Sequence, residues 1–335
     1  MFITVAICTR NRAESLRRTL ASVAAMKVPR DLAWELVVVN NESTDHTDEV
    51  IGEYRDRLPI RQEFESQPGH SNARNRAIAA ARGEYIVWTD DDVVVRPDWL
   101  QAYAGAFRCL PEAAVFGGRI MPKYEEPVVK WVIDSEATLG GAYAIRDLGD
   151  AVRPLSISGH HIPYGANFAI RTNEQRVFRY DPNLGLAPNR RRYCDEVDVI
   201  TRLLESGAKG YWIPHAVVTH CIGQEKQTIG YLTEYYIAVG ETEAFKTAAA
   251  GLPTRRWFNV PWRLWLRLWK RCLRYHVHRL ISPAPIWVMH LQAYANARGE
   301  LRYWRQQESD VATSPRRRMG SFSRATSKAD PRECS

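Results

Sequence analysis

The chain has 335 residues, enough for one large domain or for a domain with a substantial appendage. Hydrophobic residues make up 45% of it and charged residues 25%, so a soluble protein with a packed core is expected. The formal net charge of +8 favours an anionic partner, such as a nucleic acid, a phosphorylated ligand or a membrane surface.

The cysteines, the opening residues and the apolar runs argue against a zinc-binding, disulfide-linked, secreted or membrane-spanning protein. The six cysteines contain no CxxC spacing, which argues against a zinc ribbon and against a disulfide framework. The opening residues lack the charged region and the small-residue cleavage site of a signal peptide, so we interpret them as a first strand. No uninterrupted apolar run approaches the ~20 residues of a membrane span. A cytoplasmic protein is therefore expected.

The first 120 residues alternate strand and helix patterns. Strands are expected at 2–8, 35–40, 60–64, 85–89 and 114–120, and helices at 13–25, 43–54, 71–83 and from Pro97 onward. Continuous apolar strands that alternate with helices predict an α/β fold, with a parallel sheet covered on both faces. In such sheets the ligand lies beyond the carboxyl ends of the strands. Thr9, Asn40 and Asp90–Asp92 fall at such ends and are the first candidates for a site.

The remaining chain is less regular up to residue 190. A helix is expected to begin at Asp195, followed by a strand pair at 209–214 and 216–221 and by a helix over 227–250. After a boundary at Gly251, a basic, tryptophan-rich segment and a helix from Pro285 to Gln307 are expected. The polar, basic end of the chain has few core-forming residues, and we expect it to be disordered.

Asp90, Asp91 and Asp92 stand between two apolar runs. They can form a polar turn that caps the following helix, or they can bind a cation. Repulsion between carboxylates ~4 Å apart is about 4 kcal/mol per pair at an effective dielectric constant near 20, and a cation relieves it. Oxygen ligands suit Mg²⁺ or Mn²⁺, and Mg²⁺ commonly combines one or two carboxylates with substrate phosphates. The second alternative is therefore a metal–diphosphate site.

Five segments carry a resemblance to a known family. They are VAICTRNR (5–12), VVVNNESTDHT (37–47), GHSNARNRAIAAARGEYIVWTDDDVVVRPDWL (69–100), PYGANFAIR (163–171) and CDEVDVITRLLESGAKGYWIPHAVVTH (194–220). In this order, over residues 2–245, the chain resembles the family 2 inverting glycosyltransferases, which have the GT-A fold. The resemblance implies a mostly parallel, Rossmann-like sheet with helices on both faces, to which this chain adds a C-terminal helical extension.

The resemblance implies that the aspartates bind a nucleotide-sugar donor and its metal ion. Asp90 and Asp92 match the two acids of the family's Asp-x-Asp motif. Asp90 would lie near the ribose and the metal, and Asp92 would bind the metal that bridges the donor diphosphate. Asp91 occupies the variable position of this donor-binding motif.

Three further residues are implied to contact the donor. Thr9 and Asn40 would border the base, and Arg74 would contact the base or the phosphates; the alternative for Arg74 is a surface helix arginine paired with an acid. The family usually has Asp in place of Asn40, where the carboxylate accepts the N3–H of uracil or thymine. An amide makes a weaker, uncharged bond. A UDP- or dTDP-linked donor is still favoured, and Asn40→Asp is expected to tighten UDP binding.

An inverting transfer needs a general base for the acceptor hydroxyl. The resemblance places Glu196 on the family's base, Asp195 on the preceding acid and Asp198 on a third acidic position, although the order of the first two is reversed here. Alternatively, Asp195 caps the helix and Asp198 stabilises its first turn. We assign catalysis to Glu196, and mainly capping or orientation to Asp195 and Asp198.

Two more residues have two interpretations each. His220 ends a strand, where the resemblance implies a metal ligand and a structural hydrogen bond is the alternative; imidazole suits Mn²⁺ better than Mg²⁺. Asn167 either bonds sugar hydroxyls or holds a structural turn. His160 and His161 receive no firm role.

Residues 255–282 contain eight Lys or Arg, four Trp and no acid. Apolar side chains recur there every three or four positions: Phe258, Trp262, Trp265, Trp269, Leu273, Val277 and Leu280. The pattern predicts a basic amphipathic helix that lies in an anionic bilayer interface. The alternative is a helix that packs on the catalytic domain. No nucleic-acid-binding motif is found, so a nucleic-acid partner is not expected.

The expected protein is a metal-dependent inverting glycosyltransferase, using Mn²⁺ or Mg²⁺. It would move a sugar from a nucleoside-diphosphate donor to a glycan or lipid-linked acceptor in polysaccharide or glycoconjugate synthesis, at the inner face of the cell membrane. A sugar nucleotidyltransferase and an inactive, membrane-docked GT-A module are the alternatives. Residues 1–120 and 121–250 are expected to form the donor and acceptor halves of one GT-A domain, 251–308 the helical extension, and 309–335 a disordered tail.

Overall fold

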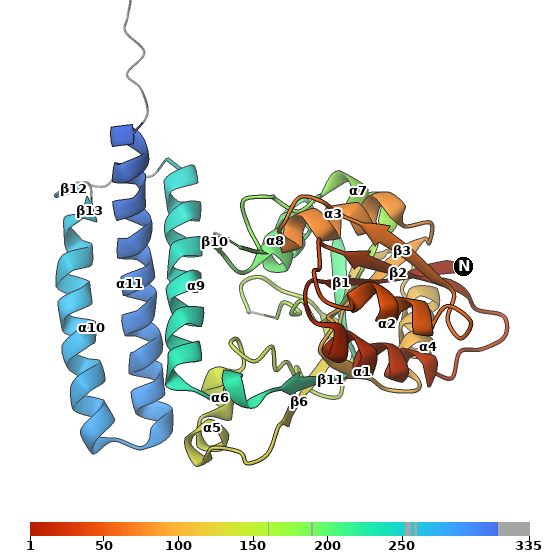
Figure 1. Ribbon diagram of the computed structural model, residues 1–335, viewed down its shortest axis with the longest axis horizontal. Helices are drawn as coiled ribbons and strands as arrows, with labels where there is room; N and C mark the ends of the chain where they lie inside the picture. Colours follow the sequence, from red (N-terminus) through yellow and green to blue (C-terminus); the bar gives the residue numbers. More distant parts are fainter. Residues whose placement is uncertain (160, 189, 252–255, 258–259, 314–335) are drawn as a thin grey trace, which may run out of the picture.

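The computed structural model describes residues 1–159, 161–188, 190–251, 256–257 and 260–313. The strands of its main sheet are β1 (Phe2–Thr9), β2 (Ala33–Asn40), β3 (Ile60–Phe64), β4 (Tyr85–Thr89), β5 (Val93–Val95), β6 (Ala113–Tyr124), β7 (Arg153–Pro154), β8 (Asn167–Arg171) and β11 (Lys209–Ile222). Their order is β3-β2-β1-β4-β8-β6-β11-β5, and β7 also pairs with β11 (Figure 1). Two short hairpins lie outside this sheet, β9 (Leu186–Ala187) with β10 (Arg190–Arg191) and β12 (Arg256–Trp257) with β13 (Val260–Pro261).

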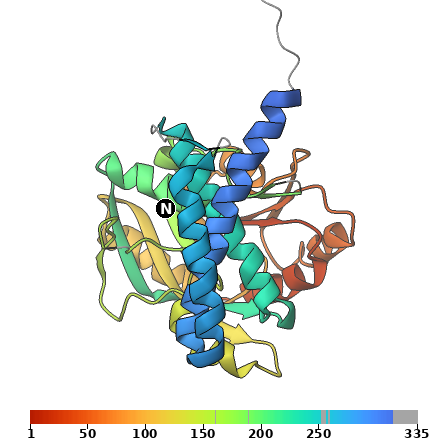
Figure 2. The ribbon, with the colours of Figure 1, turned by 90° about the vertical axis from the view of Figure 1, so that its left-hand side faces the viewer.

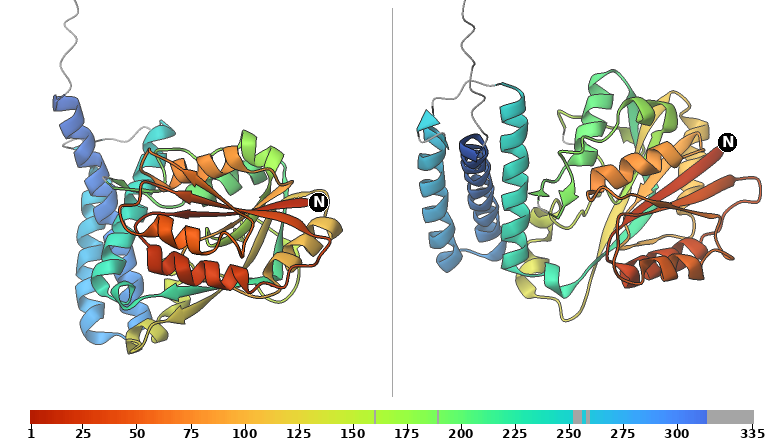
Figure 3. Two further views of the ribbon diagram at one scale, coloured as in Figure 1. Left: turned by 45° about the vertical axis from the view of Figure 1, so that its right-hand side comes forward. Right: turned by 45° about the horizontal axis from the view of Figure 1, so that its top comes forward.

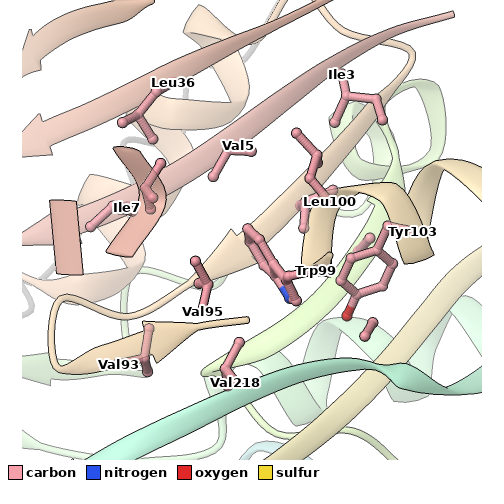
Figure 4. Packing of buried hydrophobic residues seen from close by; sticks show 14 of the residues in the cluster. Ile3, Val5, Ile7, Leu36, Val93, Val95, Trp99, Leu100, Tyr103 and Val218 are labelled. Carbon is pink, nitrogen blue, oxygen red and sulfur yellow. The ribbon is translucent and has the colours of Figure 1, made fainter. Parts of the chain in front are cut away.

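Helices cover both faces of the sheet (Figure 3). The helices before the C-terminal extension are α1 (Ala13–Ala24), α2 (Thr47–Glu53), α3 (His70–Ala80), α4 (Trp99–Cys109), α5 (Lys130–Asp134), α6 (Glu136–Leu139), α7 (Thr172–Val177), α8 (Asp195–Glu205) and the 3₁₀ turn η1 (Gln224–Lys226). In β1, Ile3, Val5 and Ile7 pack with α1, α2 and α4, whereas Ala6 packs with α3 and α8. Figure 4 shows the three β1 side chains together with Trp99 and Leu100 of α4. This alternation is what a strand buried on both faces requires.

The central sheet is mostly parallel, with an antiparallel strand at its centre. β1, β2, β3 and β4 run parallel to one another, but β8 runs antiparallel to both β4 and β6. Asn167, the first residue of β8, pairs with Thr89, the last residue of β4. The start of β8 therefore lies beside the three aspartates. The sequence pattern did not predict a strand in this segment.

The predicted strand pair at 209–221 is a single strand, which corrects the sequence interpretation. β11 runs without interruption past Pro214, and its pairing with β6 shifts register between Ile213 and Val217. Near its end, His220 pairs with Val93 of β5. Because β5 begins directly after Asp92, this pairing brings His220 to the aspartates.

Three long helices, α9 (Ile229–Ala249), α10 (Trp262–Ile281) and α11 (Ala284–Thr313), stand side by side at one end of the sheet (Figures 1 and 2). The helices α9 and α11 approach closely at two glycines. A Cβ atom on Gly240 would collide with the carbonyl oxygen of Asn296, and one on Gly299 would collide with that of Ile237.

The helical extension runs further than expected. Helix α11 ends at Thr313, five residues past the predicted boundary at 308, and residues 314–335 of the predicted disordered tail lie outside the described residues. Among the residues that the structure describes, no helix has the length and hydropathy of a membrane span.

Candidate active site

The side chains predicted to form a site meet at one edge of the sheet. Thr9 of β1 pairs with Asn40 of β2, and Asp90–Asp92 follow directly on β4, the other neighbour of β1. The carboxyl ends of these parallel strands therefore place the predicted residues together, as the alternation of strands and helices led us to expect.

Arg12 joins two of the three aspartates. Its Nη1 donates to Asp91 Oδ1 at 2.7 Å and its Nη2 to Asp92 Oδ2 at 2.9 Å. Asp91 is buried and also accepts the hydroxyl of Thr9 at 2.7 Å. Burial raises the pKa of Asp91 to about 6, with the charge of Asp92 adding to the shift and that of Arg12 opposing it. The hydroxyl of Thr9 and the carboxylate of Asp91 thus hold one another within the protein.

Asp92 Oδ2 is surrounded by positively charged or basic groups. Besides Arg12, it accepts from Lys226 Nζ at 2.8 Å and lies 3.2 Å from His220 Nε2. Burial favours the neutral acid, but the charges of His220, Lys226 and Arg12 hold the pKa of Asp92 well below its usual range. His220 Nδ1 lies 2.5 Å from the carbonyl oxygen of Tyr143, a contact that turns Nε2 toward Asp92.

Arg74 connects a second group of acids. The side chain is buried, and its Nη1 donates to Asp195 Oδ2 at 3.0 Å and lies 3.7 Å from Glu196 Oε2, while its Nη2 lies 3.8 Å from Asp90 Oδ1. The guanidinium carbon also lies 5.2 Å from the centroid of the Tyr180 ring. Arg74 is therefore not a surface helix arginine. It joins the start of α8 to the aspartates after β4.

Glu196 has the environment that a general base requires. Burial and the neighbouring charge of Asp195 raise the pKa of Glu196 to about 7, against the opposing charge of Arg74. Its Oε1 accepts the backbone N–H of Gly165 at 3.2 Å, and 16% of the side chain remains exposed. A carboxylate that titrates near neutral pH and reaches solvent can accept a proton from a bound hydroxyl.

The other two acids of α8 have different surroundings. Asp195 does not cap the helix, because the N-cap is Cys194 and Asp195 is the first helical residue. Although burial opposes ionisation, the charge of Arg74 holds the pKa of Asp195 well below its usual range. Asp198 pairs with Arg202 of the same helix at 2.9 Å and with Lys246 of α9 at 3.2 Å, so it links α8 to α9.

Two amides predicted to contact the donor are already hydrogen-bonded. Asn40 Nδ2 donates to Asp48 at 2.6 Å, and its Oδ1 accepts the N–H of Ser43 at 2.9 Å. Asn167 is fully buried, accepts from Trp99 Nε1 and the Tyr103 hydroxyl, and donates to two backbone carbonyls. All its hydrogen-bonding groups are used. This favours the structural interpretation of Asn167 over the sugar-binding one.

The donor set at Asp92 fits a divalent cation. A carboxylate oxygen and an imidazole nitrogen that converge to 3.2 Å are suitable ligands for Mn²⁺. A histidine whose other ring nitrogen contacts a backbone carbonyl is a common feature of metal sites. In the described part of the chain, no group of three or more His, Cys, Asp or Glu side chains could hold a metal. The substrate would therefore have to supply the remaining ligands, as diphosphates do.

Several residues of this site were not predicted from the sequence. Arg12 lies within the quoted segment VAICTRNR, which was the only signal for it. Lys226 and Tyr143 stand in segments without a recognised motif, and His70, 3.5 Å from Asp195, precedes the helical pattern by one residue. Of the two histidines without a role, His160 lies outside the described residues.

Comparison with known proteins identifies the family to which the chain belongs. The family model "Glycosyl transferase family 2" matches residues 4–172. The succinoglycan biosynthesis protein ExoM of Rhizobium meliloti is 30% identical over 268 residues, which cover 78% of this chain and 80% of that protein. The chain therefore belongs to glycosyltransferase family 2.

Two further similarities extend the comparison. The pre-mycofactocin glycosyltransferase of Mycobacterium tuberculosis is 27% identical over 65% of this chain, but the match spans only 42% of that protein. Mannosyltransferase PcManGT from Pyrobaculum calidifontis, solved with GDP-Man and Mn²⁺, has a TM-score of 0.52 at 18% identity over 93% of this chain and 75% of its own. This likeness confirms the predicted GT-A fold.

Proposed function

We propose that the protein is a metal-dependent inverting glycosyltransferase. It would take a nucleoside-diphosphate sugar, with UDP or dTDP favoured, and transfer the sugar to a glycan or lipid-linked acceptor in polysaccharide or glycoconjugate synthesis. The observation that carries this proposal is the pairing of Glu196, with a pKa of about 7, and Asp90 around a single buried arginine, Arg74. The proposed base and the proposed donor-binding acid would thus share one support.

Each residue of the site has its own role in the proposed transfer. Glu196 would accept the proton of the acceptor hydroxyl as that oxygen attacks the anomeric carbon. Arg74, which is bound by Asp195, would hold Glu196 in place, and Asp198 would support α8 through its contact with Lys246 of α9. Asp92 and His220 would hold Mn²⁺ or Mg²⁺, which stabilises the charge of the departing diphosphate. Thr9, Asn40, Asp90 and Asp91 would border the donor.

The second part of the proposal is peripheral contact between α10 and the inner face of the cell membrane. Apolar side chains form an exposed stripe along this helix: Trp262, Leu266, Trp269, Leu273, Val277, Leu280 and Ile281. Trp269 is 66% and Leu280 86% exposed. Trp265, which was expected in this stripe, packs inward with α9 and α11 instead, and Phe258 lies outside the described residues.

The basic residues beside this stripe support an anionic bilayer as its partner. Arg263, Lys270 and Arg274 are exposed and each directly follows an apolar residue of the stripe. Basic residues beside an exposed row of Trp and Leu are typical of helices that lie in an anionic interface. An acceptor linked to a lipid would be presented at the same surface.

A transfer assay tests the catalytic part of the proposal. The purified protein would be incubated with a panel of nucleotide sugars and Mn²⁺, and release of the nucleoside diphosphate would be measured. Glu196→Gln should lower turnover by on the order of 10²-fold or more, with nucleotide binding intact. Release of pyrophosphate from a nucleoside triphosphate and a sugar phosphate would favour a nucleotidyltransferase, and nucleotide binding without turnover would favour an inactive module.

A further inference from the structure

The ammonium group of Lys226 contacts both groups that would hold the metal. Its Nζ is 2.8 Å from Asp92 Oδ2 and 3.4 Å from His220 Nε2. These are the same oxygen and the same ring nitrogen that stand 3.2 Å from one another. A divalent cation bound by Asp92 and His220 would therefore compete with this ammonium for its position.

The backbone of Lys226 is fixed, so only its side chain can leave this position. The Lys226 carbonyl accepts the hydroxyl of Tyr143 at 3.0 Å, and the Lys226 N–H donates to Gly223 at 3.1 Å. On either side, Gln224 and Gln227 donate to backbone carbonyls of the loop before α5. The four rotatable bonds of the Lys226 side chain allow its ammonium group to move while the backbone stays in place.

The neighbouring cation does not have this freedom. Arg12 is bound by both Asp91 and Asp92, at 2.7 and 2.9 Å, and the fork geometry of its guanidinium fits that pair. Lys226, by contrast, makes a single carboxylate contact. Of the two cations on Asp92, Lys226 is the one that can be displaced at little cost.

We propose that Lys226 occupies the cation position in the donor-free protein and transfers its ammonium to the donor diphosphate when the metal ion binds. This inference rests on the proposed function, from which it takes the metal ion and the nucleoside-diphosphate donor. Asp92 cannot serve the ammonium and a divalent cation at one position, because the two repel one another. A phosphate oxygen is the natural new partner for a displaced ammonium.

The mechanism makes binding of the metal and of the nucleotide favour one another. The metal alone has to displace Lys226 without compensation and binds weakly. When a diphosphate is present, the displaced ammonium gains a new partner, so the metal binds more tightly, and by linkage the nucleotide does as well. Lys226 then disfavours the binding of free metal ions while the donor is absent.

The test measures Mn²⁺ affinity without nucleotide, by the electron paramagnetic resonance signal of free Mn²⁺. Lys226→Met should bind Mn²⁺ about tenfold more tightly than the unaltered protein, which corresponds to ~1.4 kcal/mol. Lys226→Gln provides a second neutral variant, and Lys226→Arg, which retains the charge, should not gain affinity. Lys130→Met is the matched control, because Lys130 pairs with Asp134 and has no contact with Asp92.

A second measurement, of nucleotide affinity, should change in the opposite direction. With Mn²⁺ saturating, UDP and, in parallel, GDP would be titrated by calorimetry, and Lys226→Met should bind the preferred diphosphate severalfold more weakly. Tighter metal binding with weaker nucleotide binding is not expected from a purely structural lysine. Equal or weaker Mn²⁺ binding by both neutral variants overturns the inference, as does unchanged nucleotide affinity.

Asp92→Asn separates this inference from the proposed function. Loss of Mn²⁺ binding in Asp92→Asn, with no gain in the Lys226 variants, would refute the role of Lys226 and leave the metal site in place. Equal Mn²⁺ affinity in the unaltered protein, Asp92→Asn and Lys226→Met would refute the metal site as well.

Discussion

Asn40 Nδ2 donates a hydrogen bond to Asp48 Oδ1 at 2.6 Å, and Asn40 Oδ1 accepts the backbone N–H of Ser43. The amide therefore has the acceptor that its NH₂ group needs. This reverses the expectation that Asn40→Asp would tighten UDP binding, because a carboxylate at residue 40 would face the carboxylate of Asp48.

Asn40→Asp should weaken UDP binding by roughly threefold to tenfold, since two carboxylates in contact repel one another even near solvent. The double variant Asn40→Asp/Asp48→Asn should recover the loss, because the same hydrogen bond then forms in reverse. Calorimetry with UDP and Mn²⁺ measures both. Tighter binding by the single variant would contradict this reading of the pair.

The rate should depend on pH through Glu196. Its ionised form is the base, and burial with the charge of Asp195 raises its pKa to about 7, so kcat/KM should rise with pH through an acid limb near 7. Asp195→Asn removes the neighbouring negative charge, and the limb should move to lower pH. A pH–rate profile whose limb stays in place would show that another group titrates.

Gly165→Ala should impair catalysis rather than folding. A Cβ there would lie 2.9 Å from Arg74 Nη2 and 3.3 Å from the carboxyl carbon of Glu196. Displacement of either group should lower kcat/KM by roughly tenfold or more, because the reacting groups need accurate placement. Gly105→Ala is the control: no heavy atom would lie within 4 Å of its Cβ, and an alanine in α4 should stabilise the fold by about 0.5–1 kcal/mol.

Asn167→Ala should destabilise the protein by about 3 kcal/mol or more, because several buried groups lose their partner at ~1–3 kcal/mol each. Among them are Trp99 Nε1 and the Tyr103 hydroxyl. Urea unfolding measures the change, with Asn183→Ala on an exposed turn as the control. A small effect, together with a raised KM for the acceptor, would restore the sugar-binding interpretation.

The stripe on α10 should bind vesicles of anionic phosphatidylglycerol, and high salt should weaken that binding. Trp269→Glu/Leu273→Glu places two charges in the stripe and should abolish flotation with the vesicles. Val177→Glu, at an exposed apolar side chain of α7, should have no effect. Equal flotation of the stripe variant and the unaltered protein would refute the membrane contact.

The fold was more predictable than the site. The alternation of apolar strands and helices up to residue 120 predicted the parallel strands and the edge where Thr9, Asn40 and the aspartates meet. It did not predict β8, because the apolar run of this strand, Phe168–Ile170, is too short to identify a strand by periodicity, and its position depends on pairing with β4, about 80 residues earlier.

The electrostatics of the site could not be predicted without the tertiary structure. Repulsion among three consecutive aspartates correctly indicated that cations must be near, but the sequence could not show that the protein supplies them itself. Arg12 and Lys226 are separated from Asp92 by 80 and 134 residues. Burial, which raises the pKa of Glu196 and of Asp91, is likewise a property of the folded chain.

The close approach of α9 and α11 at Gly240 and Gly299 has a consequence for any attempt to shorten the protein. Helix α9 follows directly on the turn that carries Lys226, and it shares a core with α11 that includes Leu232, Ile237 and Leu291. Deleting the chain from residue 255 onward, the simplest way to remove the helix proposed to bind the membrane, would leave α9 without its neighbour. A soluble catalytic fragment should therefore retain α11 and lose only the exposed apolar side chains of α10.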